Sequence, residues 1–303
     1  MSAAVIQSLP SSTRDATRLA ALLRIPLHEI AIHDFPDGEM RVTVGPAAPV
    51  TILYASLDHP NEKLIALLFA AEALRRGGSK RIVLLAPYLC YMRQDAAFHA
   101  GEAISQKVIG PLLARCVDRV ITIDAHLHRT PDIATVFPGI ESDNLSAMPA
   151  IADALLRTGI DPATIVVGPD AESLPWVSSL AGRLGLRHTV AQKSRRGDRS
   201  VEITFPDKTV IAGRSALVVD DIVSSGGTLI ACTRALVDAG AVAVDAVVTH
   251  ALFPEALCRQ MASSGIRSIR STRTVPHSTN AIALDGLFAE ALNNELINAE
   301  ISR

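Results

Sequence analysis

Aromatic residues are scarce in this chain, where seven phenylalanines, three tyrosines and one tryptophan make up 4% of 303 residues. Hydrophobic residues nevertheless reach 49%, so the core must be built from Ala, Val, Ile and Leu. Such aliphatic composition is typical of parallel sheets that helices cover on both faces. The length is sufficient for two α/β domains of this kind.

The chain also lacks a large net charge, paired cysteines and long apolar runs. A net charge of −2 indicates no general affinity for nucleic acid. The cysteines are widely spaced and form no metal or redox pattern, and the chain shows no secretory leader, so we expect reduced thiols in a cytoplasmic protein: Cys90, Cys116, Cys232 and Cys258. No uncharged apolar run is long enough to span a bilayer, so we expect no membrane segment.

Neither common nucleotide-binding loop is present: the segment that organises the chain is neither Gly-x-x-x-x-Gly-Lys-Ser/Thr nor Gly-x-Gly-x-x-Gly. In this segment the apolar run 216–219 predicts a buried strand that ends in Asp220 and Asp221. Two serines, two glycines and a threonine follow at 224–228, and a helical pattern then continues until Gly240.

A strand that runs into a small-residue turn and a helix N-terminus provides an anion site. Free backbone N–H groups and the positive end of the helix dipole point at the ligand, and glycines allow a phosphate to approach the backbone. Asp220 and Asp221 would repel a phosphate, whereas a carboxylate can accept hydrogen bonds from both hydroxyls of a diol. An ordinary strand-to-helix turn is the alternative, but the acid pair and the hydroxyl run favour a ribose phosphate.

Strands and helices alternate along both halves, which predicts two tandem copies of one α/β architecture with functional loops at strand C-termini. Expected strands cover 5–9, 27–34, 41–44, 51–55, 81–86, 120–123, 164–167, 187–192, 200–205, 216–219, 242–249 and 266–268. Expected helices cover 16–23, 61–76, 104–116, 147–156, 174–184, 229–239, 255–263 and 284–301, with Ser11 or Ser12 capping the first. The looser segment 127–143 is expected to join the halves.

Polar groups gather after several strands, and each has a structural alternative. Asp37 and Glu39 flank Gly38 on a turn that could simply be solvated. The loop 93–95 (Arg-Gln-Asp) follows a buried strand, where ligand groups collect, but could be a plain surface loop.

Two of these polar groups suggest a metal. His126 follows Asp124, as in a carboxylate-oriented metal ligand, although a lone histidine is commonly structural. His128 completes a His-x-His pair, but no third ligand is placed by the sequence, so we do not assign a zinc site. Asp170 could hold Mg²⁺, or it could cap the following helix.

The segment 193–199 carries four cations between two expected strands. It predicts either a solvated hairpin tip or a lid whose cations close on a polyphosphate and neutralise the charge that develops during transfer.

Together these pieces resemble the ribose-phosphate diphosphokinase family, and the ribose-phosphate motif alone also resembles type I phosphoribosyltransferases. The matching segments follow family order over almost the whole chain: Phe35-Pro-Asp-Gly-Glu39, Arg93-Gln-Asp95, Asp124-Ala-His126, Gly168-Pro-Asp170, Lys193-x-Arg195, Asp220-Asp221-Ile-Val-Ser-Ser-Gly-Gly-Thr228 and Val275-Pro-His-x-Thr-Asn280.

This resemblance implies roles for individual residues. ATP binding is implied for Phe35, Asp37, Gly38, Glu39, Arg93, Gln94 and Asp95. Ribose 5-phosphate binding is implied for Arg195, Asp220, Asp221, Ser224, Ser225, Gly226, Gly227 and Thr228. Lys193 and Arg195 are implied as catalytic cations, and His126 and Asp170 as residues that hold or orient Mg²⁺.

The resemblance further implies two type I phosphoribosyltransferase-like domains, 1–143 with the ATP site and 144–303 with the ribose 5-phosphate site and catalytic loop. It implies transfer of the diphosphoryl group of Mg-ATP to the 1-hydroxyl of ribose 5-phosphate, giving phosphoribosyl diphosphate and AMP. A homo-oligomer is implied, in which a neighbouring subunit supplies the segment 35–39.

Two other functions compete with this one. A phosphoribosyltransferase would consume phosphoribosyl diphosphate, but it would not need the matched N-terminal half. A silent regulatory relative would be expected to have lost the lid cations or the acid pair, and both are present.

Overall fold

The computed structural model describes residues 2–127, 129–196 and 200–301. The chain divides into two compact units, residues 1–145 with 284–303 (unit 1) and residues 146–283 (unit 2). The first division lies two residues beyond the expected boundary at 143. The larger difference is the tail 284–303, expected in the second domain but part of unit 1.

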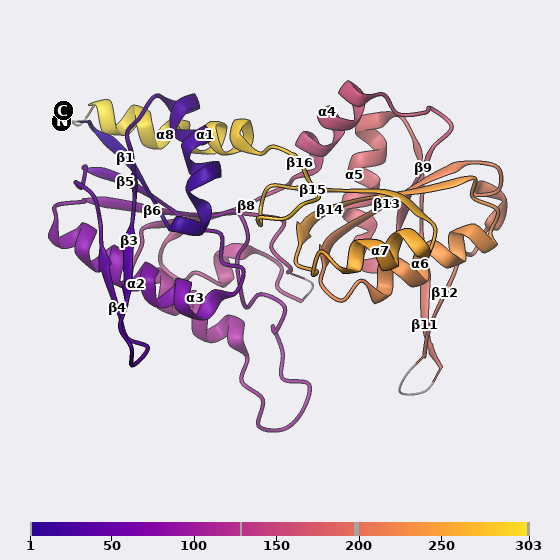
Figure 1. The fold of residues 1–303 in the computed structure, drawn as a ribbon, viewed down its shortest axis with the longest axis horizontal. Coiled ribbons are helices and arrows are strands. Elements are labelled where there is room, and N and C mark those ends of the chain that lie inside the picture. The colour runs from indigo at the N-terminus through magenta and orange to yellow at the C-terminus, as the bar shows by residue number, and fades with distance from the viewer. Residues whose placement is uncertain (1, 128, 197–199, 302–303) are drawn as a thin grey trace. The chain divides into compact units, whose positions relative to one another are not determined.

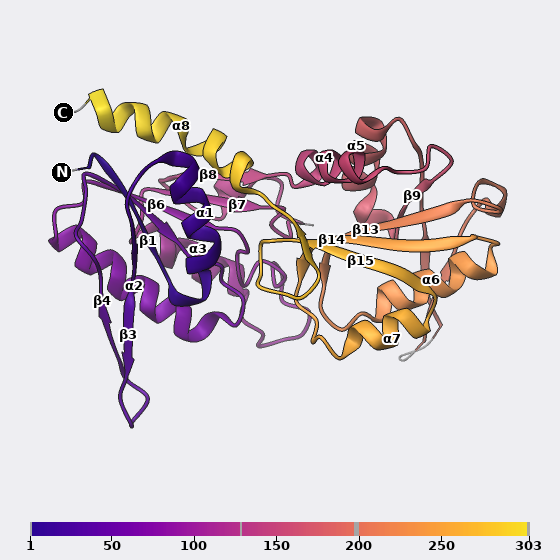
Figure 2. The ribbon, with the colours of Figure 1, turned by 45° about the horizontal axis from the view of Figure 1, so that its top comes forward.

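Unit 1 is built on a six-stranded sheet in which every pair of neighbours is parallel. Its strands in spatial order are β2 (Leu27–Glu29), β1 (Ala4–Ser8), β5 (Val50–Tyr54), β6 (Arg81–Ala86), β7 (Arg119–Ile123) and β8 (Glu141–Leu145). Helices α1 (Thr13–Leu23) and α8 (Asp285–Ile301) cover one face, and α2 (Pro60–Arg76) and α3 (Ser105–Ala114) cover the other (Figures 1 and 2). Because both faces are covered, the central strands read as continuous aliphatic runs.

Unit 2 repeats this architecture with a second parallel sheet. Its order is β10 (Arg187–Val190), β9 (Ile165–Gly168), β13 (Ser215–Val223), β14 (Ala243–Ala251), β15 (Ile266–Thr272) and β16 (Asn280–Ile282). Helices α4 (Met148–Thr158) and α5 (Leu174–Leu184) lie on one face, and α6 (Gly227–Asp238) and α7 (Leu257–Ser263) on the other (Figure 2).

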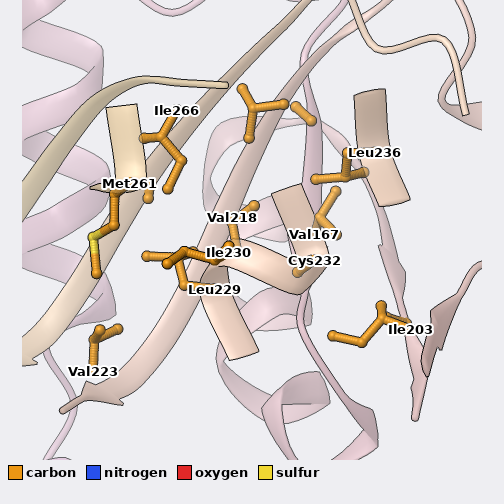
Figure 3. Close-up of a cluster of buried hydrophobic side chains, with 14 of the residues drawn as sticks. Val167, Ile203, Val218, Val223, Leu229, Ile230, Cys232, Leu236, Met261 and Ile266 are labelled. Atoms are coloured by element: carbon orange, nitrogen blue, oxygen red, sulfur yellow. The ribbon is translucent and has the colours of Figure 1, made fainter. Parts of the chain in front are cut away.

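The core of unit 2 packs aliphatic side chains of α6 and α7 against the sheet. Leu229, Cys232 and Leu236 point from α6 into a cluster that includes Val218 of β13 and Met261 of α7 (Figure 3). The spacing of the α6 residues is that of one helix face, which is why the sequence pattern alone locates this helix.

Two antiparallel hairpins extend from the sheets. The first joins β3 (Ala31–Asp34) to β4 (Met40–Thr43), and the second joins β11 (Gln192–Arg196) to β12 (Ser200–Thr204). The single strand expected at 27–34 is therefore wrong: it divides at the buried Ile30 into a sheet strand and a hairpin strand. Strand β8 begins inside the stretch 127–143, which was expected to be a connection. The strand was missed because it is short, polar and at the edge of the sheet, and so lacks an aliphatic run.

The tail helix α8 is fixed to unit 1 by buried charge. Glu295 is 4% exposed and accepts two hydrogen bonds from Arg81, at 2.6 and 2.7 Å, and one from Arg119 at 3.1 Å. Burial by itself raises the pKa of Glu295, but the bonds from the two arginines outweigh it and hold that pKa below its ordinary value. A second pair joins Arg18 of α1 to Asp285 at 2.6 Å.

Among the helices in the described part of the chain, none combines the length and hydropathy needed to cross a bilayer.

We predict that Glu295→Gln lowers the free energy of unfolding at neutral pH by about 2–3 kcal/mol. This lies between the roughly 0.2–1 kcal/mol of exposed pairs and the roughly 3–5 kcal/mol lost when one partner of a fully buried pair is removed. Urea titrations of the wild type and the variant measure it. The exposed Glu290→Gln on the same helix serves as the control and should change little.

The comparison of the wild type with Glu295→Gln also tests the pH dependence of stability. A lowered pKa means that Glu295 stabilises the fold above its unfolded-state pKa and loses that effect as pH falls through the folded pKa. The difference between wild type and Glu295→Gln should therefore shrink below about pH 4. A difference that stays constant to low pH would contradict a charged Glu295.

Candidate active site

The acid pair of unit 2 lies inside a strand rather than after it. β13 continues to Val223, and Asp220 pairs with Val248 of β14, so the expected strand end at 219 is wrong. Asp221 is 4% exposed, and its carboxylate accepts a hydrogen bond from the backbone N–H of Ile222 at 2.8 Å. The Asp221 N–H donates to Oδ1 of Asp220 at 3.0 Å. Two carboxyl groups are thus held at the carboxyl end of a central strand.

The environment of Asp220 opposes its ionisation. Burial, and then the negative charges of Asp221 and Asp170, raise the pKa of Asp220 well above its ordinary value, and a hydrogen bond between the two neighbouring carboxyl groups adds to the shift. The burial of Cys232, and then the negative charges of Asp220 and Asp170, raise the pKa of its thiol. The structure therefore gathers three carboxyl groups, Asp170, Asp220 and Asp221, of which the sequence predicted only the last two as neighbours.

A glycine turn connects the acid pair to α6. Gly226 has a φ of 72° and is the N-cap residue of the helix. The positive φ favours glycine, and a Cβ at Gly226 would lie 2.6 Å from Cδ2 of Leu257 and 2.7 Å from Cε of Met261, so the ends of these side chains would have to shift. Beyond it the first-turn N–H groups of α6 lie at the end of β13, where Ser224 and Thr228 are half-buried and Ser225 is exposed. The turn can hold an anion, as the sequence predicts.

Asp170 follows β9, whose last residue, Gly168, lies against Ser173. Oδ1 of Asp170 accepts hydrogen bonds from the N–H groups of Glu172 and Ser173 at 3.1 and 3.2 Å, and so caps the 3-10 turn Ala171–Ser173. The capping alternative for Asp170 is confirmed. Capping occupies one carboxylate oxygen and fixes the direction of the other, so it does not compete with metal binding.

The cationic segment is anchored at its base. Lys193 pairs with Ile203 across the β11–β12 hairpin, and Ile203 is buried in the core beside α6. Lys193 is exposed. Both Lys193 and Arg195 belong to strand β11 and not to the expected loop, while Gly197, Asp198, Arg199 and the side chain of Arg195 lie outside the described residues.

In unit 1 the predicted nucleotide residues lie on two separate segments. Phe35, Asp37, Gly38 and Glu39 form the tip of the β3–β4 hairpin, where Phe35 N–H donates to Glu39 O at 2.8 Å and Gly38 has a φ of 90°. Phe35 is 39% exposed. Figure 1 shows this tip apart from the long loop after β6. The chain does not bring the two groups together within its own unit 1.

The loop after β6 is held by contacts that the sequence did not suggest. Gln94 accepts a hydrogen bond from Ser105 at 2.9 Å, and Arg129 donates to both carboxylate oxygens of Asp95, at 3.0 and 3.2 Å. Arg93 is exposed. Arg129 was missed because it stands in the stretch interpreted as a connection, and no pattern around it distinguishes it.

His126 follows β7, and the turn before it is constrained. Asp124 is buried with a φ of 35°, and the N–H of Ala125 donates to the side chain of Asn144 at 2.8 Å. His128 lies outside the described residues. Within those residues no three His, Cys, Asp or Glu side chains form a group that could hold a metal by themselves. His126 belongs to unit 1 and Asp170 to unit 2.

Comparison with known proteins adds an independent finding. A family model described as the N-terminal domain of ribose phosphate pyrophosphokinase matches residues 4–116, and a phosphoribosyl transferase domain model matches residues 146–268. A ribose-phosphate pyrophosphokinase of Archaeoglobus fulgidus is 34% identical over 93% of this chain and 97% of its own length, and one of Methanopyrus kandleri is 30% identical over 91% and 94%.

The fold has a close counterpart among solved structures. The crystal structure of phosphoribosylpyrophosphate synthetase from Mycobacterium smegmatis aligns with a TM-score of 0.84 and 23% identity over 97% of this chain and 99% of that one. This likeness confirms the expected fold class of two tandem phosphoribosyltransferase-like α/β domains.

We predict that Asp220→Asn stabilises the protein by roughly 1–3 kcal/mol at neutral pH in EDTA, because it removes a half-buried charge that the carboxyl groups of Asp221 and Asp170 oppose. The raised pKa means that Asp220 costs stability above its unfolded-state pKa and that the cost disappears as pH falls below that value. Denaturant midpoints of the two proteins should therefore separate at neutral pH and converge near pH 4. A less stable variant at neutral pH would mean that Asp220 is favourably paired.

Proposed function

The chain belongs to the ribose-phosphate pyrophosphokinase family, and from this membership we propose how its residues bind both substrates and promote the transfer. It is an ATP-dependent transferase of nucleotide biosynthesis, which moves the diphosphoryl group of ATP to the 1-hydroxyl of ribose 5-phosphate and forms phosphoribosyl diphosphate and AMP. The carrying observation for the residue roles is the buried carboxyl pair that leads through a glycine turn into the N-terminus of α6.

Ribose 5-phosphate binds at this strand, turn and helix. Asp220 and Asp221 accept hydrogen bonds from the sugar hydroxyls, and Ser224, Ser225, Gly226, Gly227 and Thr228 surround the 5-phosphate. The hydroxyl donors satisfy carboxylates that burial otherwise disfavours, so the raised pKa of Asp220 falls when the sugar binds. Arg195 supplies a cation to the same substrate.

The catalytic step is an in-line displacement at the β-phosphorus of ATP. The oxygen of the 1-hydroxyl forms the new bond to phosphorus, the bond to the α,β-bridging oxygen breaks, and AMP leaves with that electron pair. Lys193 and Arg195 neutralise the charge that develops on the phosphoryl oxygens. Lys193 pairs with Ile203 across the β11–β12 hairpin, and Ile203 packs in the core of unit 2 with side chains of α6.

Mg²⁺ fits the donor set of unit 2. Asp170 and Asp220 present carboxylates whose mutual repulsion a cation relieves, and Mg²⁺ commonly binds one or two carboxylates together with waters and substrate phosphates. A group of three protein ligands is therefore not required. When bound, the ion draws negative charge off the diphosphoryl oxygens. We propose that His126 also holds or orients Mg²⁺.

ATP is held by Arg93, Gln94 and Asp95, and by Phe35, Asp37, Gly38 and Glu39 of a neighbouring copy of the chain. The separation of the hairpin tip from the loop after β6 supports a shared site (Figure 1). Ile65 and Phe69 of α2, which are 43% and 48% exposed beside the hairpin, supply apolar surface for a homo-oligomer. Free cysteines in the described chain agree with the cytoplasm as its location.

A purified-protein assay tests the proposed reaction against its closest competitor. With Mg-ATP and ribose 5-phosphate, AMP and phosphoribosyl diphosphate should form in equal amounts. A phosphoribosyltransferase would instead release pyrophosphate from phosphoribosyl diphosphate only when a nitrogenous base is added. Omission of the divalent metal should abolish the reaction.

We predict that Lys193→Ala or Arg195→Ala lowers turnover at least about 100-fold, roughly the effect of one lost transition-state donor, with milder effects on KM. Lys208→Ala, an exposed cation near the base of the same hairpin, is the matched control and should retain turnover. Steady-state rates with saturating ATP and ribose 5-phosphate decide the matter, and near-normal turnover in both hairpin variants would reject the role.

A further inference from the structure

Unit 2 contains a polar cavity at the end of its sheet opposite to the acid pair. The cavity has a volume of about 270 Å³ and lies between the C-terminal end of α4 and the first residues of β13, β14 and β15. Ser215 lines it, five residues before Asp220 on the same strand. Arg270 is closer to the acid pair, because it pairs with Val247 of β14, which in turn pairs with Val219 of β13. Its other lining residues are Thr158, Gly159, Ile160, Asp161, Thr164, Leu217, Asp245, Arg267, Ser268 and Arg270.

Arg270 is under-satisfied in this cavity. Its Nη1 donates one long hydrogen bond, 3.3 Å, to Oγ1 of Thr158. Its Nε is buried and has no acceptor among the described residues. A guanidinium offers five N–H donors in a planar fork, and a buried donor without a partner is costly, so a ligand at this position would be favoured.

The acidic groups around the cavity are already engaged. Asp245 accepts hydrogen bonds from Nε and Nη2 of Arg267 and from the hydroxyl of Ser268. Asp161 is exposed, and its Oδ1 accepts from the N–H of Ala163 at 2.8 Å. The carboxylate of Asp245 therefore binds only one of the two arginines, Arg267. Among the described residues no acid is hydrogen-bonded to Arg270.

The other unit shows how such arginines are normally matched. In unit 1, α8 packs beside α1 as α4 packs beside α5 in unit 2, and α8 supplies Glu295 to Arg81 and Arg119 at the beginnings of their strands. In unit 2 the corresponding helix offers only the hydroxyl of Thr158 to Arg270. A cavity lies beside the arginines in both units, but only in unit 1 does a carboxylate bind them, since Glu295 accepts hydrogen bonds from Arg81 and Arg119.

We propose that this cavity is a second ligand site, which binds a small oxyanion bearing a carboxylate or phosphoryl group against the guanidinium of Arg270. The terminal nitrogens Nη1 and Nη2 can donate two parallel N–H···O bonds to either group, and Thr164 and Ser215 line the same space. The volume lies just below the roughly 300–1,000 Å³ of common ligand pockets, so the ligand is a small metabolite. None of the lining residues is among those proposed to bind the sugar phosphate.

Calorimetric titration of the intact protein tests the site with two probes, acetate for the carboxylate and inorganic phosphate for the phosphoryl group. We expect the wild type to bind one more equivalent of at least one probe than Arg270→Gln does, and the tighter probe identifies the class. Arg270→Lys keeps the charge but loses the planar fork, and should weaken that equivalent at least about tenfold. Arg234→Gln, an exposed arginine on α6, is the matched control and should behave as the wild type does.

Any phosphate that binds at the sugar phosphate turn binds equally in all four proteins. The difference in stoichiometry between them therefore reports on the second site alone, whether or not the turn binds phosphate. Equal stoichiometry and affinity in the wild type, Arg270→Gln and Arg270→Lys would overturn the proposal. Absence of any millimolar binding of both probes to the wild type would also overturn it. Should Arg270→Gln fail to fold, the comparison between the wild type and Arg270→Lys still decides.

Discussion

The confinement of two adjacent carboxyl groups inside β13, Asp221 buried and Asp220 half-buried, is the constraint on which the site depends. Asp220 and Asp221 lie at the carboxyl end of a central strand, where Asp170 adds a third negative charge and no cation of the described chain offsets them at Asp220. The unliganded site is therefore electrostatically unfavourable, and hydroxyl donors or a divalent cation relieve it. The protein without ligand is therefore less stable at this place, and under the proposed function substrate binding restores the lost stability.

The rest of unit 2 fixes this unfavourable arrangement in place. Gly226 allows the chain to turn directly into α6 with a positive φ, and side chains of α7 pack against the turn. Ile203 ties the cationic hairpin to the same core. A rigid scaffold thus holds groups that would otherwise separate, which is what an enzyme that works mainly by positioning its substrates requires.

The two units solve one packing problem in different ways. Each sheet needs a helix beside its first long helix, and unit 1 takes that helix from the C-terminal tail of the chain, through Glu295 and Asp285. The tail was expected in the second domain because domain boundaries in a sequence follow chain order. Nothing in the pattern of residues 284–301 states which sheet they cover, since either sheet would bury the same apolar side chains.

The sequence by itself determined the elements with strong periodicity and the local motifs: β6, α5 and α6, the acid pair, and the glycine turn before α6. These features depend on residues that are neighbours along the chain, and so a short stretch of sequence is enough to recognise each of them. Tertiary structure alone decided that β13 continues past Asp220, that Asp170 approaches the pair, that Arg129 holds Asp95, and that Lys193 stands on a strand. Each of these depends on residues distant in sequence, whose proximity arises only when sheets and helices pack.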